Sequence, residues 1–78
     1  MILEIISPDK KIYSGEVSAV KLPGVDGSFG VLNDHAPLIA SLKKGTVKVT
    51  ENNNSILNFE INGGVVEILQ NKMIVLAG

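Results

Sequence analysis

The feature of this sequence that most limits its fold is the shortness of its apolar runs, which turn-forming residues interrupt every six to ten residues. No window of eleven or more residues combines apolar residues at helical spacing with helix-capping residues. Short runs rich in Ile, Leu and Val between turns are typical of strands. The sequence therefore predicts an all-β domain, a two-sheet sandwich or flattened barrel of about eight to ten short strands with no long helix.

The clearest single strand is Thr46–Thr50, whose strict alternation predicts that Val47 and Val49 point inward. Glu16–Leu22 carries apolar residues on both of its faces, which suggests that a partner or a loop covers the second face. Ala36–Leu42 is apolar enough to be a buried strand. The other expected strands are Ile2–Ile6, Lys11–Ser14 ending at Gly15, Ile56–Ile61, Val65–Leu69 and Met73–Leu76; the expected turns are Ser7–Lys10, Lys43–Gly45, Glu51–Ser55, Asn62–Gly64 and Gln70–Asn71.

Length and charge exclude several classes of function. A chain of 78 residues is one domain, residues 1–78, and has neither linker nor repeat. It has no cysteine and no arginine, its net charge is −1, and its aromatic content is 4%, so we expect no nucleic-acid partner. No apolar run is long enough to span a membrane as a helix, and the start lacks the pattern of a signal peptide. We expect a cytoplasmic protein without direct membrane insertion.

No combination of residues indicates catalysis. His35 is the only histidine, and no serine, cysteine or second histidine completes a nucleophilic set with it by motif. His35 beside Asp34 is too little for a zinc site, and no phosphate-binding glycine motif is present. We therefore expect no cofactor, no metal and no enzymatic activity. His35 has two open roles: a turn residue whose ring nitrogen bonds nearby backbone, or a residue at a partner surface.

The segment Leu22–Leu38 alternates glycines with prolines and so prescribes a definite path for the backbone. Glycine reaches conformations that other residues resist, and proline fixes φ and removes a donor. A loop of fixed shape is also a binding surface. We expect its geometry to depend on Pro23, Gly24, Gly27, Gly30 and Pro37.

This segment resembles the signature of F-type ATP synthase epsilon subunits, called delta in mitochondria, in their N-terminal β-sandwich domain. The resemblance lies in the spacing of the three glycines, in Val31-Leu32 and in His35-Ala36-Pro37-Leu38. It extends to Ser14-Gly15-Glu16-Val17, to Gly63-Gly64 and to Val75-Leu76-Ala77, and so covers essentially the whole chain.

The resemblance implies a non-catalytic rotor part at the foot of the central stalk. Such a subunit binds the gamma subunit, rests on the c ring, and helps couple proton- or sodium-driven rotation to ATP synthesis in the head. It is peripheral on the cytoplasmic face of the bacterial inner membrane. By position, Val25-Asp26-Gly27-Ser28-Phe29 would face the c ring, and Ser7 with His35-Ala36 would lie toward gamma. The mixed faces of Glu16–Leu22 and Val65–Leu69 are further candidates for the gamma contact.

The sequence departs from the family pattern in three places. Ser28 stands where relatives often carry glutamate, so Asp26 is the only charge of that turn. Asn33-Asp34 replaces the usual Pro-Gly and could supply an Asx-type bond. Many relatives continue past the segment like Val75-Leu76-Ala77 into an inhibitory helical hairpin; for a complete chain ending at Gly78, we expect no inhibition of ATP hydrolysis by such a hairpin.

Two alternatives remain open at this point. One is a lipoyl or biotinyl carrier domain with the group on Lys72, although this lysine lies near the end of the chain, not between two equal halves. The other is a free-standing β-sandwich binding module, which the low aromatic content does not favour.

Overall fold

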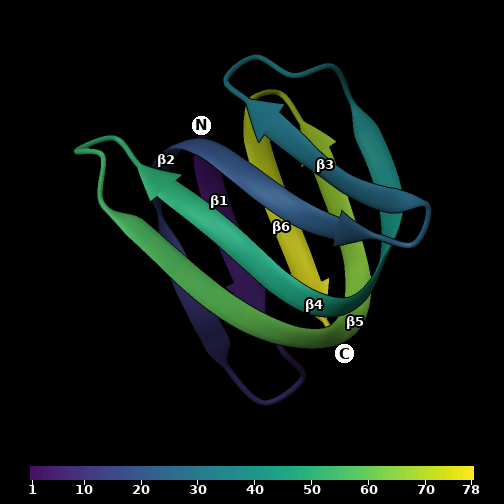
Figure 1. The fold of residues 1–78 in the computed structure, drawn as a ribbon. Coiled ribbons are helices and arrows are strands. Elements are labelled where there is room, and N and C mark those ends of the chain that lie inside the picture. The colour runs from purple at the N-terminus through teal and green to yellow at the C-terminus, as the bar shows by residue number, and fades with distance from the viewer.

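The computed structural model describes all residues from 1 to 78 and contains six strands and no helix (Figure 1). The all-β prediction is confirmed, and the strands are fewer and longer than predicted. The structure therefore contains no helix that could span a membrane. The strands are β1 (Ile2–Ile6), β2 (Lys11–Gly24), β3 (Gly27–Leu32), β4 (Leu38–Glu51), β5 (Ile56–Leu69) and β6 (Lys72–Ala77).

Five of the strands close into a barrel. The order of the sheet is β1-β6-β5-β4-β2-β3, and β1 also pairs with β2, so that only β3 lies outside the closed ring. All pairs are antiparallel except β1 with β6. Figure 1 shows β2, β4 and β5 curving from one layer into the other, which flattens the barrel into a two-layered sandwich.

Two of the predicted turns and one predicted strand end are wrong because the strand continues through them. Lys43–Gly45 lies inside β4, Asn62–Gly64 lies inside β5, and the strand predicted to end at Gly15 runs on within β2. Gly63 and Gly64 have φ of 133° and 144°, a conformation that bends the strand without ending its pairing. Gly63 and Gly64 therefore mark the place where β5 bends from one layer toward the other.

The core lies between the two layers and is entirely apolar. Val47 and Val49 are fully buried, as the alternation predicted. The mixed faces of Glu16–Leu22 have an internal cause: the register of β2 against β4 slips between Val17 and Ala19, so that residues on both sides of this bulge turn inward. The core consists of Met1, Leu3, Ile5, Val17, Val20, Leu22, Val31, Leu42, Val47, Val49, Ile61, Val66, Ile68, Met73, Val75 and Ala77.

Two of the predicted turns have the expected geometry. Gln70 and Asn71 both have positive φ, which gives the tight hairpin that joins β5 to β6. Asn54, with φ of 69°, lies in the loop between β4 and β5. The expectation of a buried strand at Ala36–Leu42 is wrong: β4 begins only at Leu38, and its outward side is open to solvent, so that Ile39 is 72% exposed.

Candidate functional site

The expectation of a loop from Leu22 to Leu38 is wrong in its middle, because Gly27–Leu32 is strand β3 and pairs with β2. The segment expected to face one partner, Val25–Phe29, forms the tip of this β-hairpin and the first residues of β3. Gly24 pairs with Gly27, and Val25 and Asp26 make the two-residue connection between β2 and β3. Gly27 has φ of 130°, and a Cβ on Gly24 would lie 2.6 Å from the main-chain oxygen of Gly27. The two glycines are therefore required by the turn itself, one by conformation and the other by lack of space.

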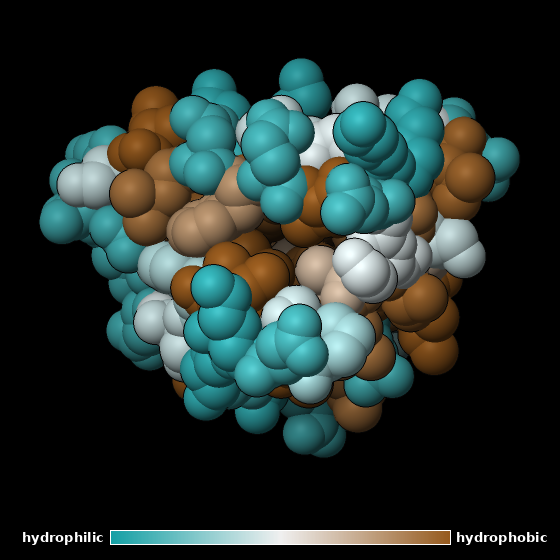
Figure 2. All heavy atoms as spheres, turned by 90° about the horizontal axis from the view of Figure 1, so that it is seen from below, coloured by the Kyte–Doolittle hydropathy of each residue, from teal (hydrophilic) through white to brown (hydrophobic).

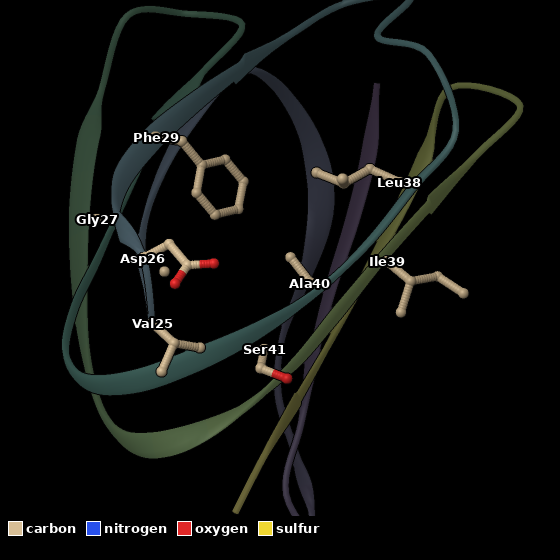
Figure 3. A pocket seen from close by; sticks show the side chains of 9 residues that line it. Val25, Asp26, Gly27, Phe29, Leu38, Ile39, Ala40 and Ser41 are labelled. Atoms are coloured by element: carbon tan, nitrogen blue, oxygen red, sulfur yellow. The ribbon is translucent and has the colours of Figure 1, made fainter.

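An open pocket of about 540 Å³ lies beside this turn, between β3 and the start of β4. Asp26, Phe29, Leu38 and Ala40 point into it, whereas Ile39 points away (Figure 3). The main-chain N–H of Val25 donates a hydrogen bond of 3.0 Å to the oxygen of Ser41, which ties the turn to β4. Its lining carries one charge and is otherwise apolar or neutral; it consists of Gly24, Val25, Asp26, Gly27, Phe29, Leu38, Ile39, Ala40 and Ser41.

His35 and Ala36 lie in the loop Asn33–Pro37, between β3 and β4. The Nδ1 atom of His35 is 2.7 Å from the main-chain oxygen of Ala36, which is the local backbone bond of the first role considered for this histidine. Asp34 has φ of 61°, and its N–H donates to Oδ1 of Asn71 at 2.8 Å. The loop is thus held against the β5–β6 turn.

Asn33 does not form the Asx-type bond that its position suggested. Its Oδ1 accepts a hydrogen bond of 2.7 Å from the ammonium group of Met1, which also donates to the oxygen of Val17 at 3.2 Å. Charge-assisted bonds of this kind are stronger than a neutral Asx bond. The side chain therefore ties the loop to the start of the chain.

Ser7 lies at the end of β1, where the chain turns toward β2. Its N–H donates to the oxygen of Lys10 at 2.9 Å, and its Oγ also lies within hydrogen-bond distance of this main chain. The predicted turn at Ser7–Lys10 is confirmed, and the local role of Ser7 is to close it.

An outward layer formed by β1, β6, β5 and the start of β4 carries large apolar side chains in solvent. Val65 lies directly opposite Leu76, and Ile39 lies opposite Glu67, so these side chains share one side of the sheet. Figure 2 shows the molecule from below, where hydrophobic residues lie among hydrophilic ones; the residues of the outward layer itself are identified by their exposed fractions. We call this surface the apolar face; its members are Ile2, Ile39, Val65, Leu69 and Leu76, which are 44%, 72%, 38%, 53% and 53% exposed.

The structure places Ser7 and His35-Ala36 at opposite ends of the apolar face. Ser7 follows Ile6, whose register partner on β6 is Leu76. The loop that carries His35 is bonded to Asn71, which precedes β6 at its other end. Sequence positions that lie far apart therefore frame one surface.

The charges on the apolar face are few and partly paired. Glu4 lies between two lysines, with its carboxylate oxygens 3.1 Å from Nζ of Lys11 and 3.6 Å from Nζ of Lys72. The hydrogen bond and the charge of Lys11, with a smaller contribution from Lys72, hold the pKa of Glu4 below its ordinary value. Lys72, the residue of the carrier-domain alternative, is thus the first residue of β6 and is engaged with a carboxylate.

Several of the other predicted residues have roles that differ from expectation. Pro23 is buried, and a Cβ on Gly45 would lie 2.8 Å from its Cβ, so the proline packs where β4 bends. Pro37 is exposed just before β4. Gly30 does not serve loop geometry: its φ is ordinary, and an added Cβ would meet no atom within 4 Å. The apolar residues Val17, Val20 and Leu22 are buried, which removes Glu16–Leu22 as a candidate contact face.

Sequence reasoning missed the parts of these surfaces that depend on strand register. Leu38, Ile39 and Leu76 belong to the pocket or the apolar face, and only the alternation of exposed and buried residues along β4 and β6 could have pointed to them. The sequence predicts Asn71 only as a turn residue, and no sequence signal indicates its hydrogen bond with Asp34. No group of three or more His, Cys, Asp or Glu is placed to hold a metal ion.

Comparison with known proteins gives consistent matches over the whole chain. The protein-family model described as ATP synthase, Delta/Epsilon chain, beta-sandwich domain, matches residues 1–78. The ATP synthase epsilon chain of Chlorobium limicola is 45% identical over 74 residues, which are 95% of this chain and 84% of that protein. That of Sulfurimonas denitrificans is also 45% identical over 74 residues, but these cover only 57% of its length.

Solved structures share the fold. A chain in the cryo-EM structure of Euglena gracilis mitochondrial ATP synthase, OSCP/F1/c-ring in rotational state 1, superposes with a TM-score of 0.93 at 22% identity. A second, in the central stalk/c-ring structure of Tetrahymena thermophila mitochondrial ATP synthase, gives 0.82 at 19% identity. The alignments cover 99% of this chain, and 49% and 62% of those chains.

Proposed function

The chain belongs to the family of ATP synthase delta/epsilon chains through their β-sandwich domain, and on this basis we propose that it is a non-catalytic rotor subunit of an F-type ATP synthase. In this role it bridges the gamma subunit and the membrane c ring, couples ion-driven rotation to ATP synthesis, and reaches the head through gamma. It is peripheral on the cytoplasmic face of a bacterial membrane, without a cofactor.

The observation that supports the gamma contact most directly is the apolar face. A small domain that leaves a group of large aliphatic side chains in water gains stability when a partner covers them. Ser7 and the His35-Ala36 segment, which the family resemblance assigns to gamma, frame this same face at its two ends. The prediction of Val65–Leu69 as a gamma candidate fits, because Val65 and Leu69 both belong to the face.

The turn Val25–Phe29 supports the contact with the c ring. It projects from the sandwich at the β4 edge of the apolar face, because Val25 is bonded to Ser41, whose register partner is Val65. Asp26 is the only charged residue of the turn, and its carboxylate points into a pocket that is otherwise uncharged. No other charge in the pocket would therefore compete with Asp26 for a basic group on the partner. The two contact surfaces are thus adjacent but distinct.

Two binding measurements with purified components test this function. Replacement of Leu76 by Lys places a charge on the apolar face, directly opposite Val65, and should weaken binding to a head–gamma complex that lacks this subunit by at least about tenfold, or about 1.4 kcal/mol. Replacement of Asp26 by Lys reverses the charge of the turn and should weaken binding to the isolated c ring while gamma binding is retained.

Replacement of Ile56 by Lys is the matched control, because Ile56 is 55% exposed but lies on the outer side of the opposite layer. This variant should bind both partners like the wild type. The proposal fails if the wild-type protein binds neither partner, or if the control weakens gamma binding as much as Leu76→Lys does.

A further inference from the structure

Strand β3 is the one strand of this fold that is paired on a single side. Every other strand has at least two partners, and β2 has three, whereas β3 pairs only with β2. In an antiparallel ladder, every second residue of an edge strand directs its N–H and C=O groups away from its neighbour. The edge of Gly27–Leu32 therefore offers a row of backbone donors and acceptors to a further strand.

This edge lacks the features by which proteins usually prevent strand addition. Such edges are typically protected by lysine, proline, a bulge or an inward charge. The residues of β3 are Gly, Ser, Phe, Gly, Val and Leu, with no charge and no proline, and their register with β2 is regular from Gly27 to Leu32. Nothing in the side chains of β3 opposes pairing with another uncharged strand.

The open edge lies beside the open side of the core. Phe29 of β3 and Leu38 of β4 are only half-buried and point into the pocket between the two layers (Figure 3). A strand added to β3 would extend this layer and bring its own inward side chains toward the pocket. One added strand would thus satisfy the free backbone groups and cover exposed apolar atoms at the same time.

We propose that two copies of the free chain associate by antiparallel pairing of β3 with β3 about a two-fold axis near Gly30. A two-fold axis pairs identical edges, and this edge is uncharged, so that no like charges face each other across it. Lys21 lies beside Gly30 on β2, and the two copies of Lys21 would stand three strand spacings apart, about 14 Å, beyond the screening length at physiological salt.

Gly30 fits the place that the axis would occupy. It has an ordinary φ and open space around it, so that nothing within one copy accounts for the absence of a side chain. At the axis, two glycines let two backbones approach without a steric conflict. The inference goes beyond the proposed rotor function and does not depend on it. Because the Val25–Phe29 turn is also the proposed c-ring surface, the pairing belongs to the unassembled subunit.

Sedimentation equilibrium of the purified chain tests the proposal. A single pair of short strands makes a small interface, so we expect the average mass to rise toward twice the monomer value between about 10 μM and about 1 mM. Amide hydrogen exchange of β3 should slow over the same range, while that of the loop Glu51–Ser55 should not change.

The variant Gly30→Lys should remain monomeric throughout, because it sets two ammonium groups against each other while its Cβ meets no atom of its own chain. Asn58→Lys is the control, since Asn58 is exposed on β5 of the same layer, away from the edge. Urea unfolding of both variants checks that the monomer is intact. A wild type that stays monomeric at every concentration overturns the proposal, as does a Gly30→Lys variant that dimerises normally. Protection of β3 that appears only on addition of gamma or the c ring would assign the edge to a partner strand instead.

Discussion

The phenol of Tyr13 is partly buried and is bonded to Glu51, and a titration of this group measures the two effects together. The Oη atom of Tyr13 donates to Oε2 of Glu51 at 2.5 Å, and the ring lies against Phe59 with a centroid distance of 5.4 Å. Burial of the phenol, then its bond to Glu51 and the charge of Glu51, raise the pKa of Tyr13 to about 12. Tyr13 is the only tyrosine and the chain has no tryptophan, so near-ultraviolet absorbance of tyrosinate reports this group alone.

The sign of the effect on stability follows from linkage. The folded pKa lies above the unfolded value of 10.0, so the stabilisation is fully present below pH 10 and is lost as the pH rises through 12. At about 1.4 kcal/mol per unit the loss could reach roughly 2.7 kcal/mol, and because the ring is partly exposed we expect about half of this. Urea unfolding should show this loss between pH 10 and pH 12 in the wild type, and Tyr13→Phe should be free of it.

The substitution Glu51→Gln separates the effect of burial on the pKa of Tyr13 from the effect of the Glu51 carboxylate. It removes the charge and keeps an acceptor, so the midpoint of the tyrosinate titration should fall but stay above 10, since burial of the phenol remains. Glu60→Gln is the control, because Glu60 also accepts a hydroxyl bond, from Thr46, but on the exposed surface. Circular dichroism during the titration shows whether the chain is folded at the midpoint. A folded wild type that titrates near 10, or an unchanged midpoint in Glu51→Gln, would refute the reasoning.

Three further predictions concern the scaffold. Gly64→Ala places a Cβ 2.1 Å from a main-chain oxygen of β6 at φ of 144°, so it should lower the free energy of unfolding by about 3 kcal/mol or prevent folding, whereas Gly30→Ala should change it by less than about 0.5 kcal/mol in urea denaturation. The lowered pKa of Glu4 stabilises the fold above its ordinary value of 4.5, and this stability is lost as the pH falls through the lower folded pKa; Glu4→Gln should therefore show a smaller loss of stability below pH 4.5, and an identical acid profile would contradict the pairing. Asn71→Ala removes the acceptor of the Asp34 N–H, and amide exchange at Asp34 should become faster; no change would show that the bond does not hold the loop.

Local pattern was enough to predict the fold class and several details of it. The alternation around Val47 and Val49 reports a face packed on a core, and the pair Gln70-Asn71 reports a turn, because each signal depends only on neighbouring residues. Both signals are local, so they do not depend on which distant strands pair with each other.

The features that could not be predicted depend on pairing between distant strands. Gly64 has the composition signal of a turn, but it serves a bend because β6 passes against it, as its approach to the oxygen of Leu76 shows. Leu76 and Ile39 are exposed on one face only because β5 lies between their strands in a particular register. A single sequence does not specify this register, so the apolar face was recognised only at Val65–Leu69.

The three fourteen-residue strands β2, β4 and β5 each belong to both layers, and this has a mechanical consequence. In a sandwich whose layers share no strand, a lateral load is resisted by interdigitated side chains, which can slip. Here each layer is continued by the covalent backbone of the other, so a lateral load applied at the apolar face is carried as tension along three peptide chains. A rotating shaft bound to one layer would therefore turn the other layer with it, with little movement of the two layers relative to each other.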